Sequence, residues 1–173
     1  YGPTENNVNP MPAYGEGYRW YTTGLTHDVR GFPTNVPSEI VATLDKLRHK
    51  IEDYEDEIQK LSVKWLEDAD IVMVSYGSVA RTVLQAVMLA RGAGIKVGCV
   101  QLYTIWPFPS RQLRELMTGK SKVIVAELNM GQLVHEVERV APAGTSVSPL
   151  QRYDGEIFTP TQLIEAIEQA ARA

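Results

Sequence analysis

The sequence predicts an α/β fold in which a parallel sheet carries helices on both faces. Short apolar runs with the length of strands recur at residues 71–78, 95–104 and 122–128, and a segment with helical periodicity follows each of them. The 173 residues are 44% hydrophobic and 22% charged, which is the balance of one ordinary globular domain with a sizeable core. Alternating units of this length therefore favour a three-layer α/β/α domain.

Residues 1–37 are predicted to form a loop-rich lead-in, and residues 38–173 the α/β domain. The opening is rich in Pro, Gly and Asn, and it has neither the basic start nor the apolar run of a signal peptide. A start in the middle of a linker, at Tyr1, indicates a piece of a longer polypeptide. Within the lead-in, residues 18–23 (YRWYTT) are β-prone and are bounded by glycines, which predicts a short strand.

A long amphipathic helix is predicted from Ser38 onward. Apolar residues spaced four and three apart fall on one stripe of such a helix, namely Ile40, Leu44, Leu47, Ile51, Tyr54, Ile58 and Leu61. The residues between them are mostly charged and indicate a solvated face. Two interpretations stay open. The favoured one is that the stripe packs on its own domain; the other is that it binds a coiled-coil partner, which makes the chain an interaction domain.

The rest of the chain alternates strand and helix. Helices are predicted over residues 79–90, 111–117, 132–140 and 161–173, and a weaker strand over residues 145–153. Ser78 is the expected N-cap of the first of these helices. Pro149 lacks a backbone donor, so the weaker strand is expected at an edge of the sheet. Thr159 and Gln162 are typical of a capping box at the start of the last helix.

Composition and missing motifs argue against several function classes. The net charge is −4 and the basic residues are scattered, which disfavours nucleic acid as a partner. No stretch approaches the roughly 20 apolar residues that span a bilayer. The phosphate-binding patterns GxGxxG and GxxxxGK[ST], the nucleophile elbow GxSxG and the CxxC pair are absent, so no cofactor, metal or catalytic set is expected in this chain. The single cysteine, Cys99, lies in an apolar run and is expected to be buried and structural, which fits a reducing cytoplasm.

Candidate site residues follow from where the strands are predicted to end. Ligands and partners of open parallel sheets gather at the carboxyl edge of the strands. That edge is expected to carry Tyr76, Gly77, Ser78, Thr104, Trp106, Glu127, Asn129 and Gln132. His27, in the loop Thr26-His27-Asp28, is the one candidate from the lead-in.

Each chemically suggestive feature also has a structural interpretation. The turn at Gly77 and Ser78 could bind an anion through free backbone N–H groups, but strand-to-helix turns need such residues anyway. Glu127 ends an apolar strand; without a second acid or a nearby histidine, hydrogen bonds that organise loops are favoured over acid–base catalysis. A loop histidine beside an aspartate, as at His27, is more often structural than functional.

Four motifs in order resemble the second domain of 2-oxoacid:ferredoxin oxidoreductase alpha subunits, most closely the 2-oxoglutarate type. They are YGEGYR and TGLTHD at residues 14–19 and 23–28, SYGS with AR at residues 75–81, TIWPFP at residues 104–109, and ELNMGQL at residues 127–133. The resemblance covers nearly the whole chain. It implies a fold like the C-terminal domain of transketolase, with five strands of which the first is antiparallel, and residues 18–23 were the expected source of that strand.

The resemblance also implies a function for the whole enzyme. Such enzymes oxidatively decarboxylate a 2-oxoacid with coenzyme A and pass the electrons to ferredoxin, using thiamine diphosphate, magnesium and iron–sulfur clusters held elsewhere. This chain is then expected to act as a scaffold against the other domains of the alpha subunit and against the beta subunit. The alternative is a stand-alone flavodoxin-like module that binds a small molecule or a nucleotide.

Overall fold

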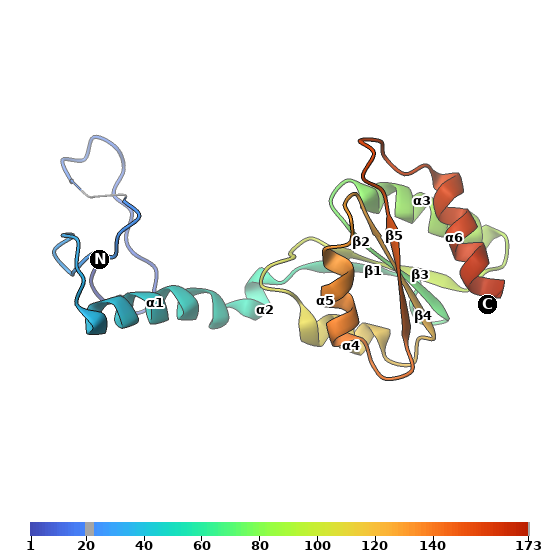
Figure 1. Cartoon of the computed structure of the whole chain (residues 1–173), viewed down its shortest axis with the longest axis horizontal. Coiled ribbons are helices and arrows are strands. Elements are labelled where there is room, and N and C mark those ends of the chain that lie inside the picture. Colours follow the sequence, from blue (N-terminus) through green and yellow to red (C-terminus); the bar gives the residue numbers. More distant parts are fainter. Residues whose placement is uncertain (20–22, 173) are drawn as a thin grey trace. The chain divides into compact units, whose positions relative to one another are not determined.

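The computed structural model describes residues 1–19 and 23–172, and the chain divides into two compact units, Tyr1–Ile58 and Gln59–Ala173 (Figure 1). The first unit contains α1 (Pro37–Glu52) and α2 (Glu55–Ile58). The second contains β1 (Leu61–Lys64), β2 (Ile71–Tyr76), α3 (Val79–Gly92), β3 (Val97–Leu102), α4 (Ser110–Met117), β4 (Lys122–Glu127), α5 (Leu133–Val140), β5 (Ser146–Gln151) and α6 (Pro160–Arg172).

The second unit is built on a five-stranded sheet with the order β1-β3-β2-β4-β5. Strands β2, β3, β4 and β5 run parallel, and β1 pairs antiparallel with β3. Pro149 lies in β5 at the edge of the sheet, as its missing N–H predicts. The α/β class and the mostly parallel sheet are therefore confirmed.

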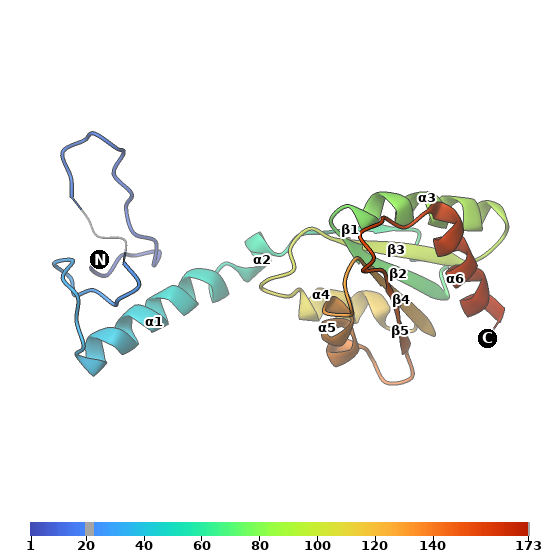
Figure 2. The same cartoon turned by 45° about the horizontal axis from the view of Figure 1, so that its top comes forward.

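The two faces of the sheet are covered by different helix pairs, which makes three layers (Figure 2). Val72 and Val74 of β2 point into the core beneath α4 and α5, whereas Ile71 and Met73 point into the core beneath α3 and α6. Because successive side chains of a strand point to opposite faces, an apolar run without alternation is required when both faces are buried. This is why the run at residues 71–76 could be recognised as a central strand.

The antiparallel strand comes from a segment that the sequence did not mark as a strand. Residues 18–23, the expected source, lie partly outside the described residues. Instead, β1 at Leu61–Lys64 supplies the odd strand, and it begins where the backbone carbonyl of Lys60 accepts hydrogen bonds from the N–H groups of Tyr103 (3.0 Å) and Thr104 (3.2 Å). The assignment of the odd strand to residues 18–23 was wrong.

The long helix is shorter than its apolar spacing predicted. It begins at Pro37, with Val36 as the N-cap, and ends at Glu52, so Leu61 is in β1. The residues that follow Glu52 are strongly acidic (sequence DYEDEI), and negative charge at a helix C-terminus is disfavoured by the helix dipole. This helix groups with the lead-in, so the structural boundary lies at residues 58–59, whereas the sequence placed it at 37–38.

Predicted ends of the later helices agree with the structure. Ser78 is the N-cap of α3, although its side chain makes no capping hydrogen bond. At α6 the predicted capping box is present: the Thr159 N–H donates to Gln162 Oε1 (3.0 Å), and the Gln162 N–H donates to Thr159 Oγ1 (3.4 Å).

Candidate functional site

The carboxyl edge of the parallel strands brings four of the predicted site residues into one network. Tyr76 ends β2, Glu127 ends β4, and Asn129 and Gln132 lie in the turn between β4 and α5. We call this network the rim. Its residues come from adjacent strands because β2 and β4 are neighbours in the sheet, paired from Ile71 with Lys122 onward.

Glu127 is fully buried and accepts hydrogen bonds from the start of α5. Its Oε2 accepts from the N–H of Leu133 (2.9 Å) and of Gln132 (3.3 Å), and its Oε1 accepts from the N–H of Val134 (3.1 Å). These are N–H groups that have no partner inside the helix, and the carboxylate lies at the positive end of the helix dipole. These hydrogen bonds are the ones that the loop-organising interpretation of Glu127 predicts.

Asn129 links the same turn to the neighbouring strand. Its Oδ1 accepts from the N–H of Gly131 (2.8 Å) and of Gln132 (3.1 Å), and its Nδ2 donates to the Tyr76 hydroxyl (2.8 Å). Burial raises the pKa of the Tyr76 phenol, and the nearby charge of Glu127 raises it further, while the bond from Asn129 acts in the opposite direction. Tyr76 therefore stays protonated, and its oxygen accepts a hydrogen bond in the network.

The same edge also includes Gly131 and Arg152, where the ends of the strands predict them. Gly131 has a φ of +92°, and a Cβ atom there would lie 2.1 Å from Gln151 Nε2, so the end of β5 packs directly on the turn. Arg152 follows β5; its side chain donates to Asp154 Oδ1 (2.8 Å), to the Ile157 carbonyl (2.7 Å) and to Gln162 Oε1 (3.1 Å). Glycine, which has no Cβ atom, permits both this positive φ and this close approach.

The other predicted edge residues have separate roles. Gly77, with a φ of +59°, and Ser78 make the turn into α3. Thr104 Oγ1 accepts a hydrogen bond from the Lys60 N–H (3.2 Å), which fastens the start of β1. Trp106 is 70% exposed, and its peptide bond to Pro107 is cis.

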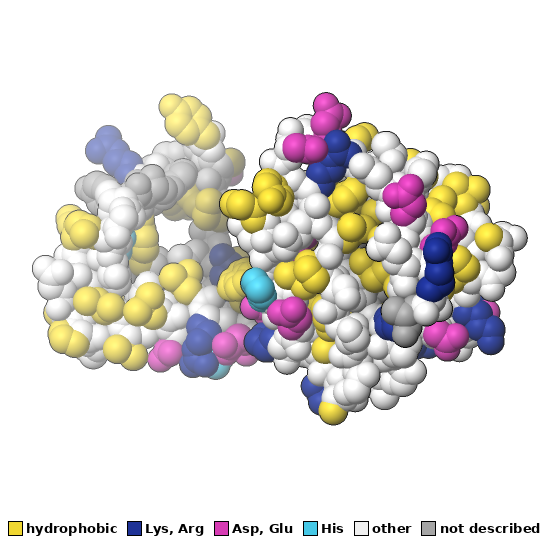
Figure 3. Space-filling model, turned by 45° about the vertical axis from the view of Figure 1, so that its right-hand side comes forward, with side chains coloured by type: hydrophobic (Ala, Val, Ile, Leu, Met, Phe, Trp, Pro, Cys, Tyr) yellow, Lys and Arg dark blue, Asp and Glu magenta, His cyan; other side chains and the backbone are white. Residues whose placement is uncertain are grey.

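Large apolar side chains are exposed in the loops that follow the parallel strands. They are Tyr103, Ile105 and Trp106 after β3, Met130 after β4, and Tyr153 and Ile157 after β5. Figure 3 shows hydrophobic side chains at several places on the surface of the sheet unit. The carboxyl edge therefore combines a hydrogen-bonded polar network with an exposed apolar margin, a composition found in protein interfaces.

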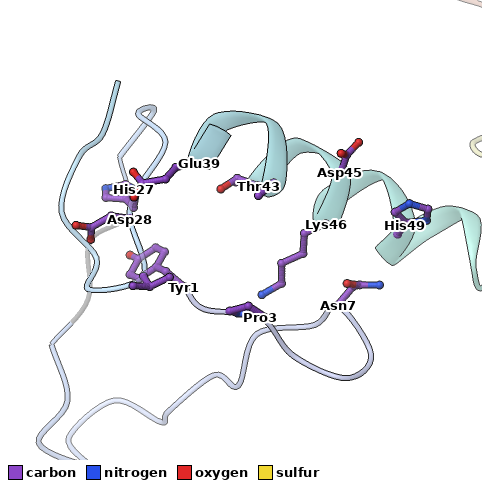
Figure 4. A pocket seen from close by; sticks show the side chains of 12 residues that line it. Tyr1, Pro3, Asn7, His27, Asp28, Glu39, Thr43, Asp45, Lys46 and His49 are labelled. Carbon is purple, nitrogen blue, oxygen red and sulfur yellow. The ribbon is translucent and has the colours of Figure 1, made fainter. Parts of the chain in front are cut away.

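His27 lies in the first unit and is described apart from the rim. It is buried, its Nε2 lies 3.1 Å from Thr23 Oγ1, and its ring packs against Tyr1 with centroids 5.0 Å apart. The adjacent Asp28 carboxylate binds Arg30 and accepts the N–H of Phe32 (3.0 Å), and these bonds lower the pKa of Asp28, with the backbone bond from Phe32 contributing most. Figure 4 shows His27 at the wall of a cavity of about 330 Å³ between the lead-in and α1.

The single thiol is where the sequence placed it. Cys99 lies in β3, is buried beneath α3, and has its pKa raised by that burial. Over residues 1–19 and 23–172, no group of three or more potential metal ligands is found. In the same residues no helix is long and apolar enough to cross a membrane.

The chain is similar to several known proteins. It is 40% identical over 158 residues to the 2-oxoglutarate synthase subunit KorA of Methanothermobacter marburgensis, which covers 91% of this chain and 42% of that protein. The corresponding subunit of Methanocaldococcus jannaschii is 40% identical over 165 residues, covering 95% of this chain and 44% of the relative. The chain thus spans less than half the length of the curated relatives it matches.

Solved structures and a family model agree with these relatives. The 2-oxoglutarate:ferredoxin oxidoreductase from Magnetococcus marinus, solved with 2-oxoglutarate, coenzyme A and succinyl-CoA bound, matches 98% of this chain and 30% of that chain with a TM-score of 0.83 and 27% identity. A split-gene transketolase matches 65% of this chain and 41% of that chain with a TM-score of 0.56 and 22% identity, which indicates a shared fold. The model of pyruvate:ferredoxin oxidoreductase core domain II matches residues 69–163, more than half of the chain, so this chain belongs to that domain family.

Proposed function

We propose that this chain is the structural, inter-subunit domain of the alpha subunit of a 2-oxoglutarate:ferredoxin oxidoreductase. The whole enzyme oxidatively decarboxylates the 2-oxoacid with coenzyme A and passes the electrons to ferredoxin. The choice of 2-oxoglutarate rests on the relatives, which are 2-oxoglutarate synthase subunits, and on the solved oxidoreductase. In this proposal the chain orients the other domains of the alpha subunit and the beta subunit, and a cytoplasmic location follows from the ferredoxin chemistry.

The observation that carries the proposal is that the polar groups of the rim are occupied by the chain's own backbone and side chains. The Glu127 carboxylate holds three N–H groups of α5, and Asn129 holds two more together with the Tyr76 hydroxyl. A catalytic acid or base needs a group within hydrogen-bond reach of the substrate. These groups are instead used to fix one turn, so the rim supports a rigid surface better than a reaction.

The same geometry argues against a thiamine diphosphate site in this chain. A bound magnesium diphosphate needs several oxygen ligands, and the buried carboxylate of the rim already accepts three backbone hydrogen bonds. The residues of the rim therefore do not fit the cofactor. We place thiamine diphosphate, magnesium and the iron–sulfur clusters on other domains of the enzyme, and no reaction step is assigned to this chain.

The exposed apolar margin of the rim supplies the contact surface in this proposal. Trp106 and Met130 are 70% and 74% exposed, and Tyr103 and Tyr153 lie in the neighbouring loops. Aromatic residues and Met are enriched at protein interfaces because they bury large areas at a small entropic cost. Thr104, Gly77, Ser78 and Gln132 hold the turns that present these side chains, and His27 serves the same purpose in the lead-in.

Reconstitution tests the proposal. The chain is co-expressed with the remaining polypeptides of the oxidoreductase, and ferredoxin reduction is measured with 2-oxoglutarate and coenzyme A. We expect turnover from the assembly and none from the chain alone. Trp106→Asp should weaken assembly about 10-fold or more, because a buried aromatic anchor contributes at least 1.4 kcal/mol. Leu89→Asp, at a half-exposed position in the last turns of α3, is the matched control and should leave assembly unchanged.

Ligand titration of the chain alone separates the proposal from the stand-alone module. We expect no stoichiometric binding of thiamine diphosphate, flavin or nicotinamide nucleotides at micromolar concentration. Such binding would favour the flavodoxin-like module, and decarboxylation of 2-oxoglutarate by the chain without other subunits would refute the scaffold role outright.

A further inference from the structure

The first unit, Tyr1–Ile58, contains no hydrophobic core among its described residues. Among residues 1–19 and 23–172, all 29 buried hydrophobic residues lie in the second unit, from Leu66 to Ile167. By contrast, 12 of the 21 exposed large hydrophobic residues lie in the first unit, from Tyr1 to Leu47. A segment that exposes its apolar side chains in this way does not recover the entropic cost of ordering its backbone.

Polar side chains of α1 and of its C-cap make hydrogen bonds to the lead-in. Lys46 Nζ donates to the Gly2 carbonyl (2.7 Å) and to Asn9 Oδ1, and Asn7 Nδ2 donates to Asp53 Oδ2 (3.4 Å). Figure 4 shows Lys46 directed toward the lead-in across the cavity, with Thr43 and Glu39 also lining it. The lead-in therefore holds the helix by polar contacts.

The apolar side of α1 carries four residues at spacings of four, three and four. We call them, with the adjacent Val41, the α1 stripe: Ile40, Val41, Leu44, Leu47 and Ile51. None of these side chains is buried; Leu44 is 58% and Leu47 53% exposed, although both line a cavity together with Gly24 and Leu25 of the lead-in. Figure 3 shows hydrophobic side chains on the surface of the first unit.

Charged side chains along the stripe are already paired within the helix. Arg48 forms ion pairs with Asp45 (3.3 Å) and with Glu52 (3.1 Å). Covering the stripe would therefore not leave the Arg48 charge without a partner, which is the usual cost of burying a charged helix face.

We propose that the Tyr1–Ile58 unit is a docking arm whose α1 stripe packs into an apolar groove on another folded domain of the same oxidoreductase, outside these 173 residues. This inference rests on the proposed function. Anchors at i, i+4, i+7 and i+11 are the pattern of a helix lying in a groove. The acidic run that follows α1, residues 53–57, predicts basic side chains at one end of that groove.

Two observations favour this occupant over a second copy of the chain. The helix has 16 residues and ends at Glu52, so the stripe spans fewer than the three or four heptads that a coiled coil needs. The curated relatives extend well beyond the matched part, which is 42% and 44% of their lengths, so subunits of this kind contain further folded chain that can supply a groove.

Hydrogen exchange and binding of the assembled oxidoreductase test the arm. We expect the amides of α1 to exchange rapidly in the chain alone and at least about 100-fold more slowly in the assembly. Leu44→Glu with Leu47→Glu should weaken assembly about 100-fold, because two leucine side chains would no longer be buried. Met88→Glu, a 51%-exposed position on α3, is the matched control and should assemble normally.

The outcomes separate this inference from the proposed function. If the double variant assembles as tightly as the wild type, the arm is refuted and the scaffold role stands. Self-association of the chain alone that the double variant abolishes would assign the stripe to a second copy and overturn the inference. Loss of exchange protection in β2 and β4 of the double variant would show that the stripe is core, which also overturns it. If the wild-type chain fails to assemble at all, both proposals fall.

Discussion

Glu127→Gln is the substitution that tests the central interaction of the rim. The wild-type carboxylate has two oxygens, one of which accepts one backbone N–H and the other two. A glutamine has the same shape but only one acceptor oxygen. If the glutamine oxygen takes the place of Oε2, it still accepts from the N–H groups of Gln132 and Leu133. The NH₂ group then takes the place of Oε1 and faces the N–H of Val134, which is left without an acceptor.

The magnitude follows from these three bonds. A buried N–H without a partner costs about 1–3 kcal/mol, and the two remaining bonds change from charge-assisted to neutral, a loss of about 0.5 kcal/mol or more each. The neutral amide is cheaper to bury than the carboxylate, which offsets part of the loss. We expect the free energy of unfolding to fall by about 2–3 kcal/mol, and Tm by about 10 °C for a unit of this size.

Denaturation by urea, followed by circular dichroism, measures the loss. Glu138→Gln is the matched control, because Glu138 lies on the exposed side of the same helix, where it pairs with His135, and its loss should cost less than about 0.5 kcal/mol. Exchange of the Leu133 and Val134 amides should also accelerate in Glu127→Gln and not in the control. If the two variants unfold at the same urea concentration, the buried carboxylate is not what fixes the start of α5, and the account of the rim fails.

Three further predictions concern neighbouring positions. Gly131→Ala should lower the free energy of unfolding by about 1 kcal/mol more than Gly119→Ala in the same urea experiment. Both glycines have positive φ, but only at Gly131 would a Cβ meet another side chain, that of Gln151. Equal losses of stability in the two variants would contradict this close approach. The pKa of Tyr76 lies above its ordinary 10.0, so the folded state holds the phenol proton more tightly than the unfolded state; the associated stability is present below pH 10.0 and is lost as the pH rises above it. Tyr76→Phe should remove this contribution to the loss of stability at alkaline pH, as measured by urea denaturation at successive pH values. If the free energy of unfolding depends on pH in the same way in the variant and the wild type, the contribution of Tyr76 is refuted. The Cys99 thiol, buried and with a raised pKa, should react with Ellman's reagent at least about 100-fold more slowly in the native chain than in denaturant, and rapid native labelling would place it at the surface.

The sequence predicted the structure best at positions where a single physical requirement, such as burial or a missing hydrogen-bond donor, restricts which residues can occur. The strand at 71–76 could be recognised because burial on both faces demands an uninterrupted apolar run, and Pro149 could be placed at an edge because it lacks a donor. The carboxyl-edge residues Tyr76, Glu127 and Asn129 could be grouped because parallel strands end at a common edge. Their hydrogen bonds could not be assigned, since each depends on a turn geometry that spacing does not encode.

The sequence was misleading where local and tertiary preferences compete. The apolar spacing from Ile40 to Leu61 is continuous, yet the helix stops at Glu52 and Leu61 pairs with Leu102 in the sheet. A four-residue strand such as β1 has too few residues to show alternation, and its pairing with β3 is gained only in the folded unit. Within the first unit, every residue of the α1 stripe is at least partly exposed, so that unit alone does not bury it.

The two units use their polar and apolar residues in different ways. In the second unit, apolar residues fill both faces of the sheet and the rim's hydrogen-bonding capacity is used to position α5, so little remains with which to recognise a small molecule. In the first unit, polar contacts orient a helix whose apolar side is left uncovered. In the two proposals, recognition falls to exposed apolar side chains, which are Trp106 and Met130 in the second unit and Leu44 and Leu47 in the first. Such side chains gain free energy by excluding water over a large surface, which a protein partner offers and a metabolite does not.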